Sequence, residues 1–389
     1  MPRLAPGLLR KAGRIDGLLP LLLQTTRDIE SARNELRWLT EHAIVEAKTH
    51  SGSVGWRKRL QHLCHERRRG KPLQYLLGTE YFGDLEIRCK PGVLIPRHVS
   101  RIHPCVKPSG LILLNRQETA ASVTYLVKKL DRLAKNNRNL RILDLCTGTG
   151  CIPLLFHDEY YKLHSPTTTL ELLGVDISAQ ALRLANENKL HQMHKQKTPA
   201  KPKTARESSL ANLRFRHGDV LSTGCSFKLS EGGSFSQTLR NHTSDTAKSK
   251  WDIVISNPPY ISPQAFNRTT SRSVRNFEPK LALVPSNLFG LPGVTAGDVF
   301  YPRLLEIANL VEARIVLFEV ADMEQARRVA SMAVEQGIWT GIEIWRDYPE
   351  HDEDEQNDKE SGNGGLQNVK IIGSGNGRSV FAWRGTGIN

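Results

Sequence analysis

Long apolar runs are missing from this sequence of 389 residues: the longest leucine-rich stretch, Gly17–Leu23, has 7 residues. A helix that crosses a bilayer needs about 20 mostly apolar residues, so an integral membrane protein is excluded. Cysteine is also scarce, with 6 in the chain and no Cys-x-x-Cys pair. This number and spacing exclude a disulfide framework and give no zinc pattern. We therefore expect a protein of a reducing compartment, with no membrane span and no metal site.

Acidic residues are few relative to basic ones: 40 Asp and Glu stand against 54 Lys and Arg, a formal net charge of +14. A chain this basic should be drawn to polyanions such as nucleic acid, the ribosome or an anionic membrane surface. Proteins of the mitochondrial matrix and of RNA-rich compartments are commonly this basic without binding RNA specifically. The charge therefore has two interpretations: proximity to the ribosome or RNA, or a basic protein that binds neither. The length corresponds to two domains at about 100–200 residues each.

The first 27 residues contain a single acid, Asp16, among several leucines. Their basic residues are Arg3, Arg10, Lys11, Arg14 and Arg27. An Arg-rich, acid-poor start is typical of a mitochondrial transit peptide, although serine is absent here and no cleavage site is evident. The alternative is an ordinary basic first helix. We predict a targeting segment at 1–27 and a location in the mitochondrial matrix.

A helical region and a connector follow. Apolar residues at near-helical spacing predict helices over 28–72, with a stop at Gly70. These apolar positions are Ile29, Ala32, Leu36, Leu39 and Ile44. Turn-forming and aromatic residues then lead into the alternating segment Leu85–Arg88. We therefore predict a small N-terminal helical domain at 28–72 and a β-hairpin connector at 73–97.

From Arg141 onward, short apolar runs alternate with helical stretches. The runs are Arg141–Leu145, Thr169–Val175, Leu213–His217, Trp251–Ser256 and Arg314–Val320, with Ile342–Trp345 and Ser379–Trp383 as a closing pair. The helical stretches include Ala179–Leu190 and Pro302–Glu312. Strands that alternate with helices predict an α/β fold with a doubly wound, mainly parallel sheet, which binds ligands at the carboxyl ends of its strands.

Four segments break this alternation. Residues 98–116 show neither helical nor strand spacing, and we predict that they are an insertion with no role in catalysis. The other three are rich in lysine and proline, in serine, glycine and threonine, or in acids followed by glycine and asparagine; they are 191–210, 222–249 and 350–376. These compositions predict disordered insertions within a domain that spans 117–389.

Three acids at strand ends predict a nucleoside site. Asp144 leads a glycine-rich turn that contains Gly148 and Gly150, and such a turn lets a ligand approach the backbone. Asp176 ends the next strand, where a carboxylate can accept hydrogen bonds from two ribose hydroxyls. Asp219 ends the third strand, within reach of an adenine amino group. Each acid alone could be a helix cap, but together they favour an adenosine-type cofactor.

The fourth strand ends in Asn257-Pro258-Pro259-Tyr260, the most specific feature of the chain. An NH2 group on a carbonyl or a ring is a poor nucleophile because its lone pair is delocalised. A site that methylates such a group must hold both N–H bonds and aim the nitrogen. The Asn257 side-chain oxygen and the Pro258 carbonyl can accept these two bonds, the prolines stiffen the turn, and Tyr260 can pack on the planar group.

Several motifs together resemble those of one family. Asp144–Cys151, Gly174–Asp176 and Ser256–Ser262 resemble class I S-adenosylmethionine-dependent methyltransferases of the N-methylating branch. Further stretches resemble the HemK/PrmC family, and these are Gly70–Gly78, Phe82-Gly83, Pro91–Arg97, Val274–Leu283 and Gly297–Tyr301. The resemblance covers most of 28–97, 117–190 and 211–347.

The resemblance implies a protein-(glutamine-N5) methyltransferase of the mitochondrial type, acting on the glutamine of the GGQ motif of a peptide-chain release factor. It implies a seven-stranded Rossmann-like domain with S-adenosyl-L-methionine as cofactor, and an N-terminal bundle that helps hold the release factor. We also expect a monomer. The implied catalytic residues are Asn257, Pro258 and Tyr260. The implied cofactor residues are Asp144, Thr147, Gly148, Thr149, Gly150, Asp176, Asp219 and Asn257. The implied substrate residues are Phe82, Pro96, Arg97, Asn257, Pro258, Pro259 and Tyr260.

One departure concerns the family motif IPRPET, which here reads Ile95-Pro-Arg97, then nineteen other residues, then Gln117-Glu-Thr119. Gln117 replaces a proline, which puts the contacts of this segment in doubt. Two alternative functions are a nucleic-acid adenine N6-methyltransferase, whose acceptor amine NPPY would also fit, and a non-catalytic ribosome-associated binding protein. The first would need a target-recognition domain, for which the chain has little room. The intact Asp144, Asp176 and NPPY weigh against the second.

Overall fold

The computed structural model describes most of the chain. The described ranges are residues 4–49, 55–96, 118–133, 139–165, 168–197, 204–222, 250–286, 295–351 and 369–385. Arg97, the insertion at 98–116 and nearly all of 222–249 lie outside these ranges, so the predictions made for them stay predictions.

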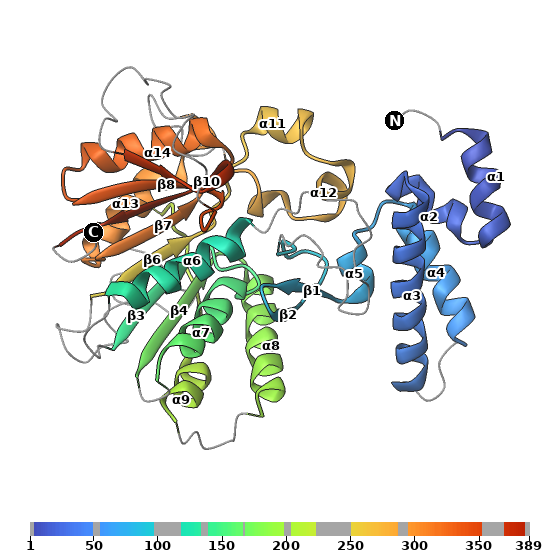
Figure 1. Ribbon diagram of the computed structural model, residues 1–389, viewed down its shortest axis with the longest axis horizontal. Coiled ribbons are helices and arrows are strands. Elements are labelled where there is room, and N and C mark those ends of the chain that lie inside the picture. Colours follow the sequence, from blue (N-terminus) through green and yellow to red (C-terminus); the bar gives the residue numbers. More distant parts are fainter. Residues whose placement is uncertain are drawn as a thin grey trace.

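The N-terminal region forms a helical bundle, which we call the bundle (Figure 1). Its helices are α1 (Pro6–Ile15), α2 (Leu19–Thr26), α3 (Ile29–Thr49) and α4 (Trp56–Arg68). Apolar side chains from all four helices share one core, made of residues such as Ala12, Leu22, Leu23, Leu39 and Leu63. The boundary predicted at residue 28 thus falls between two helices of one packed unit. Whether residues 1–27 direct import stays a prediction.

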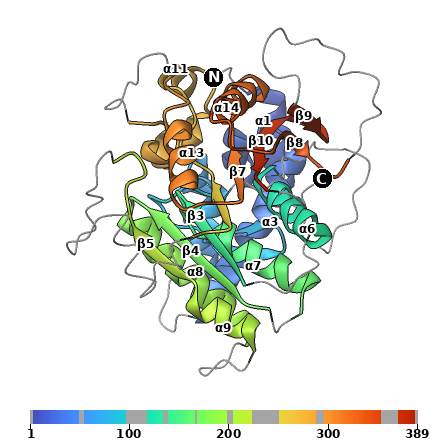
Figure 2. The same cartoon turned by 90° about the vertical axis from the view of Figure 1, so that its left-hand side faces the viewer.

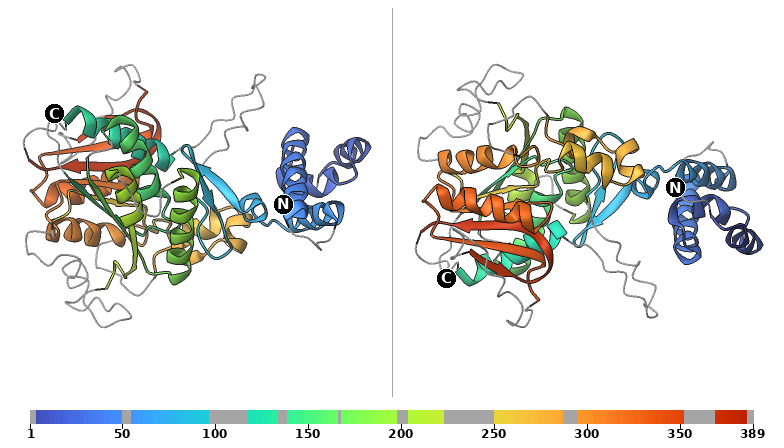
Figure 3. Two further views of the ribbon diagram at one scale, coloured as in Figure 1. Left: turned by 90° about the horizontal axis from the view of Figure 1, so that it is seen from below. Right: turned by 90° about the horizontal axis from the view of Figure 1, so that it is seen from above.

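The bundle ends in a short connector. Arg67, at the end of α4, forms a bidentate ion pair with the buried Glu35 on α3, with N···O distances of 2.7 and 2.8 Å. Gly70 then stops the helix in the left-handed region at φ +95°, as predicted. The predicted connector contains a short helix, α5 (Leu73–Leu77), before its hairpin of β1 (Thr79–Phe82) and β2 (Leu85–Arg88). Figure 3 shows the bundle set apart from the larger domain and joined to it through this connector.

Within the residues that the structure describes, the larger domain is built on a sheet of eight strands. They are β3 (Leu140–Leu145), β4 (Leu170–Asp176), β5 (Arg214–His217), β6 (Ile253–Ser256), β7 (Ile315–Glu319), β8 (Gly341–Tyr348), β9 (Val369–Ile372) and β10 (Ser374–Trp383). Their order is β5-β4-β3-β6-β7-β10-β8-β9, with β3 to β7 parallel and β10 antiparallel between β7 and β8. The mainly parallel α/β sheet and the closing pair are confirmed. The strand count of seven is wrong, because β9 pairs parallel with β8 and adds an edge strand.

Helices cover both faces of the sheet (Figure 2). On one face, α6 (Glu118–Leu133), α7 (Cys151–Leu163), α8 (Ala179–Lys195) and α9 (Ala205–Asn212) pack with the β1–β2 hairpin on one apolar cluster. On the other face, α13 (Phe300–Leu310) and α14 (Met323–Glu335) pack on a second cluster. The segment after β6 carries α11 (Pro263–Arg268), α12 (Arg272–Phe277) and a 3-10 turn, η2 (Lys280–Ala282). Within the described residues, every helix is too short or too polar to cross a bilayer.

Two predicted disordered insertions contain regular structure. In the segment 191–210, α8 continues to Lys195 and α9 begins at Ala205. Thr204 and Glu207 form a capping box there: the Thr204 hydroxyl accepts the Glu207 N–H, and the Glu207 carboxylate accepts the Thr204 N–H. In the segment 350–376, residues from Val369 onward form β9 and the start of β10. The lysine-rich and glycine-rich compositions concealed these local signals.

The strand order brings two loops together. The chain runs from β3 to one side through β4 and β5, then crosses back to β6 and β7, so the order reverses between β3 and β6. Ligands in open α/β sheets bind beside the carboxyl ends of strands at such a point. The glycine-rich turn after β3 and the Asn257–Tyr260 loop after β6 flank this point of reversal. The Ser256 hydroxyl of β6 donates to the Leu145 carbonyl of β3 at 2.7 Å.

Candidate active site

The glycine-rich turn folds back onto the end of β4. The Thr147 N–H donates to the Val175 carbonyl at 3.0 Å, which seats the turn on the neighbouring strand. Gly148 has φ +54° and faces open space, since a Cβ added there would meet nothing within 4 Å. Gly150 has φ +74°, and its Cβ would lie 2.7 Å from the Phe215 ring. One glycine therefore leaves room beside the turn, and the other allows close packing beneath it.

Asp176 anchors this turn. One of its carboxylate oxygens accepts the Gly148 N–H and the other accepts the Ser178 N–H, both at 2.8 Å. Burial raises the pKa of Asp176, while these two donors oppose the shift. A carboxylate offers about four lone-pair sites, so each oxygen retains acceptor capacity. Asp176 can therefore hold the turn and still bind two hydroxyl groups.

Two adjoining cavities lie along the carboxyl edge of the sheet. The larger cavity, of about 150 Å³, is lined by Asp176, Asp219, Gly148, Pro259 and apolar residues that include Val93, Leu221 and Leu281. The smaller cavity, of about 60 Å³, is lined by Phe82, Pro96, Thr119, Thr147, Thr149, Pro258 and Tyr260, among others. Leu94, Cys146, Gly148, Asn257 and Ala282 line both cavities and form their junction.

Asp144 lies beneath the turn and lines neither cavity. Its side chain is 0 % exposed, and neither carboxylate oxygen has a hydrogen-bond partner among the described residues. Burial raises the pKa of Asp144 to about 8, with the Asp176 charge adding to the shift and Thr147 opposing it. The nearby Thr147 hydroxyl is also buried and its geometry falls short of a hydrogen bond. A cation beside this pair would offset the cost of the buried acid.

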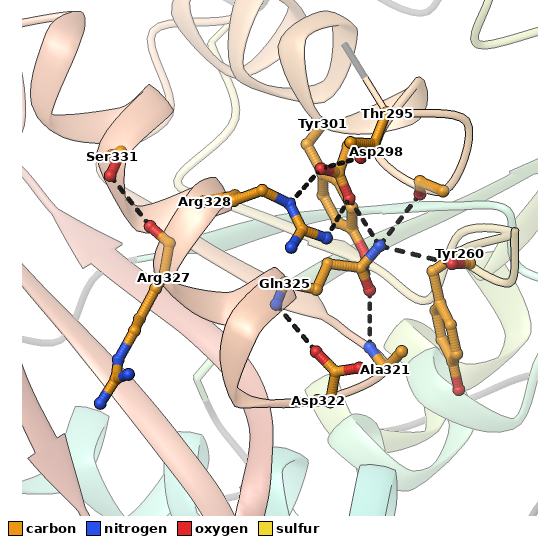
Figure 4. A network of polar contacts seen from close by, with 11 residues as sticks. Tyr260, Thr295, Asp298, Tyr301, Ala321, Asp322, Gln325, Arg327, Arg328 and Ser331 are labelled. Atoms are coloured by element: carbon orange, nitrogen blue, oxygen red, sulfur yellow. Dashed lines mark hydrogen bonds and ion pairs between the residues drawn. The ribbon is translucent and has the colours of Figure 1, made fainter.

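The Asn257–Tyr260 loop is held from behind by a buried polar network (Figure 4). The Gln325 side-chain amide, from α14, donates to the Tyr260 carbonyl at 3.3 Å, to the Gly297 carbonyl at 3.1 Å and to the Asp298 carboxylate at 2.8 Å. The Arg328 guanidinium binds Asp298 at 2.6 and 3.2 Å. Burial by itself would raise the pKa of Asp298. The hydrogen bonds that the Asp298 carboxylate accepts from side chains, above all from Arg328, nevertheless hold this pKa below its ordinary value. These contacts fix the backbone of Tyr260.

The structure gathers most of the predicted site residues at these cavities. Gly148, Asp176, Asp219, Asn257 and Pro259 line the larger cavity. Phe82, Pro96, Thr147, Gly148, Thr149, Asn257, Pro258 and Tyr260 line the smaller one. Asp144 and Gly150 line neither, and Arg97 lies outside the described residues. The roles assigned to all of these residues stay predictions.

Sequence reasoning missed four residues. Cys146 lines both cavities and holds φ +62°, which is unusual for a residue with a Cβ. Thr119 lines the smaller cavity and donates to Glu319, and Gln325 holds Tyr260. Glu319 ends β7, so the argument applied to the acids after β3, β4 and β5 could have found it. Cys146 lies within Asp144–Cys151 and Thr119 ends the split family motif, but the sequence analysis assigned neither of them a role. Nothing local marks Gln325. In the part of the chain that the structure describes, no three His, Cys, Asp or Glu side chains are arranged to hold a metal ion.

The sheet order, the glycine-rich turn, the acid after β4 and the Asn257–Tyr260 loop after β6 define a class I S-adenosylmethionine-dependent methyltransferase fold. No family model matches the chain. It is 32% identical over 286 residues to the mitochondrial MRF1 N(5)-glutamine methyltransferase MTQ1 of Saccharomyces cerevisiae, covering 73% of this chain and 68% of that protein.

Two further relatives agree with this match. The probable MRF1 mitochondrial N(5)-glutamine methyltransferase of Schizosaccharomyces pombe is 30% identical, with 81% of this chain and 84% of that protein covered. The release factor glutamine methyltransferase of Haemophilus influenzae is 27% identical, with 76% and 78% covered. The chain therefore belongs to the HemK/PrmC family of release factor glutamine methyltransferases, as its motifs predicted.

Proposed function

We propose that this protein transfers a methyl group from S-adenosyl-L-methionine to the side-chain amide nitrogen, N5, of the glutamine in the GGQ motif of a mitochondrial peptide-chain release factor. The observation that carries the proposal is the place of Asn257. This residue stands at the junction of the cavity with the strand-end acids and the cavity with Tyr260. A group there can orient an acceptor in one cavity toward a donor in the other.

The larger cavity fits the nucleoside part of the cofactor. Asp176 keeps acceptor capacity for two ribose hydroxyls, and Asp219, whose carboxylate accepts the Leu221 N–H at 2.9 Å, lies on the same wall. The open space at Gly148 lets a ligand approach the backbone. Asp144, buried without a hydrogen-bond partner among the described residues, suits a site that receives a cationic group. When bound, S-adenosyl-L-methionine supplies an electrophilic methyl group on a positively charged sulfur.

The smaller cavity fits a planar carboxamide. The Asn257 side-chain oxygen and the Pro258 carbonyl accept the two N–H bonds and aim the nitrogen at the junction. Buried Pro258 and Pro259 restrict the backbone there, so little freedom is lost when the amide binds. Tyr260, Phe82 and Pro96 enclose the side chain and exclude water. Holding the reacting nitrogen in place supplies the orientation that a weak nucleophile requires.

The bundle is the part of the chain that we assign to holding the release factor, because it stands apart from the sheet and is joined to the smaller cavity through the connector that carries Phe82. Two relatives are named as mitochondrial enzymes, which supports a mitochondrial location for this chain and, with the arginine-rich start, the matrix. Nothing in the site favours a nucleic-acid substrate or a purely binding role over the family activity.

The decisive experiment is transfer of a labelled methyl group from S-adenosyl-L-methionine to a mitochondrial release factor by the full chain. The matched substrate is the same factor with its GGQ glutamine replaced by alanine. We expect label in the first factor and none in the second, with mass spectrometry placing the methyl on the glutamine side chain. Equal label in both factors, or none in either, would overturn the proposal.

A further inference from the structure

Glu319 is a buried acid one step behind the smaller cavity. It lies at the carboxyl end of β7, next to β6, and is 5 % exposed. One of its carboxylate oxygens accepts the hydroxyl of Thr119, from the start of α6. The other accepts the hydroxyl of Tyr260 at 3.1 Å. A single carboxylate thus holds two hydroxyl groups from segments that are far apart in the sequence.

Both hydroxyl-bearing residues line the smaller cavity, whereas Glu319 itself does not. A hydroxyl group has one hydrogen to donate and two lone pairs that accept. When its hydrogen is given to a carboxylate, the oxygen can only accept from other groups. Thr119 and Tyr260 therefore present acceptors to the cavity, as the Asn257 side-chain oxygen and the Pro258 carbonyl do in the proposed function.

We infer that Glu319 is a specificity-determining residue, which makes the smaller cavity accept a neutral carboxamide and reject a carboxylate. The inference rests on the proposed function and deepens it. A glutamine side chain brings two N–H donors, which the Asn257 side-chain oxygen and the Pro258 carbonyl accept in the proposed function. A glutamate side chain of the same shape leaves these two acceptors unpaired and places a negative charge beside Thr119 and Tyr260, whose hydroxyl hydrogens point to Glu319 and not to the cavity. Both effects disfavour it, because unmatched polar groups and unpaired charges are costly in a buried site.

The test compares two inhibitors in the methyl-transfer assay of the full chain. One is the release factor with its GGQ glutamine replaced by glutamate, and the other is the factor with methionine there, which is neutral and of similar length. Contacts elsewhere on the factor cancel in the ratio of the two inhibition constants. For the parent protein we expect the glutamate form to inhibit at least about tenfold more weakly.

Glu319→Gln should lower this ratio of inhibition constants to about threefold or less. The new amide can donate to the two hydroxyl groups, so that their hydrogens can turn toward the cavity. Glu343→Gln is the matched control: Glu343 is also a buried acid, 4 % exposed, but it lies on β8 and binds Lys129 and the Trp345 ring N–H. The control should have the same ratio of inhibition constants as the parent protein. A partial loss of folded protein lowers the activity but does not change this ratio.

Thr119→Val provides a second variant in case Glu319→Gln does not fold, since it removes one cavity hydroxyl and leaves the acid. Thr119→Val should lower the ratio of inhibition constants by about threefold. A ratio that stays at the parent value in folded Glu319→Gln or Thr119→Val, or a parent protein that both forms inhibit equally, would overturn the inference. Failure of the parent to methylate the glutamine form would instead overturn the proposed function, so the two failures are distinguishable.

Discussion

The two cavities of the candidate active site are built in different ways. The larger cavity takes its polar groups from the ends of adjacent strands: Gly148 after β3, Asp176 at the end of β4 and Asp219 after β5. The smaller cavity combines Phe82 from the hairpin, Pro96, Thr119 from α6 and the loop after β6. Each polar group of the larger cavity is marked by its own strand, whereas the smaller cavity exists only after distant segments have packed. The comparison predicts separable defects, in cofactor binding for the first and in acceptor use for the second.

Asn257→Ala should give the largest effect and tests whether the cavities are separable at their junction. The variant loses a group that orients the acceptor nitrogen, so we expect turnover to fall by roughly 100-fold or more. Calorimetry should show cofactor affinity within about threefold of the parent. Asn186→Ala is the matched control, because the Asn186 side-chain amide donates to the Leu182 carbonyl of its own helix, α8, at 2.8 Å. Near-normal turnover in Asn257→Ala would refute its proposed role.

Asp176→Ala should produce the opposite defect. It removes the acceptor for two ribose hydroxyls and also releases Gly148 and Ser178, which Asp176 binds. A hydrogen bond to a charged group contributes about 1.5–3 kcal/mol, so cofactor affinity should fall by at least about tenfold. Binding of the release factor alone should be unchanged. Asp252→Ala is the control, since Asp252 accepts the Arg141 N–H at the opposite end of the sheet. Unchanged cofactor affinity in Asp176→Ala would make this acid a structural cap.

The same contrast explains how much the sequence could predict. Short apolar runs with a turn after each were sufficient to predict the parallel strands and three residues of the larger cavity, Gly148, Asp176 and Asp219. Asn257, Pro258 and Tyr260 were predicted because their chemistry is contained in four consecutive residues. Glu319 and Gln325 bind Tyr260, and Thr119 binds Glu319, only through the packing of α6, β7 and α14. No local pattern encodes such contacts, and the capping box at Thr204 was hidden by its lysine-rich surroundings.

Gln325→Leu tests whether the support behind the loop acts on the acceptor cavity alone. The change removes the donor to the Tyr260 and Gly297 carbonyls and the acceptor for the Ala321 N–H. Each buried group left unpaired costs about 1–3 kcal/mol, so the melting temperature should fall. We expect turnover to drop by about tenfold, with unchanged cofactor affinity. The control is Gln336→Leu, at the end of the same helix, where the side chain bonds Trp339 instead. An equal loss of cofactor affinity would show that the cavities are not separable.

Asp144→Asn tests the acid beneath the glycine-rich turn, which lines neither cavity, through a pH-dependent change in stability. Burial raises the pKa of Asp144 to about 8, whereas an unfolded aspartate titrates near 3.9. Between these values the unfolded chain has released the proton that the native protein keeps, so the native state loses stability as pH rises. The loss is at most about 1.4 kcal/mol per pH unit and ends above pH 8. The asparagine side chain does not titrate in this range. The free energy of unfolding of the variant should therefore rise relative to that of the parent as the pH increases from 5.5 to 8. Urea unfolding at four pH values measures this difference.

Saturating S-adenosyl-L-methionine should make the free energy of unfolding of the parent depend less steeply on pH, because a bound cation favours the ionised acid. Parallel curves for the two proteins without cofactor would show that Asp144 is not the buried titrating group.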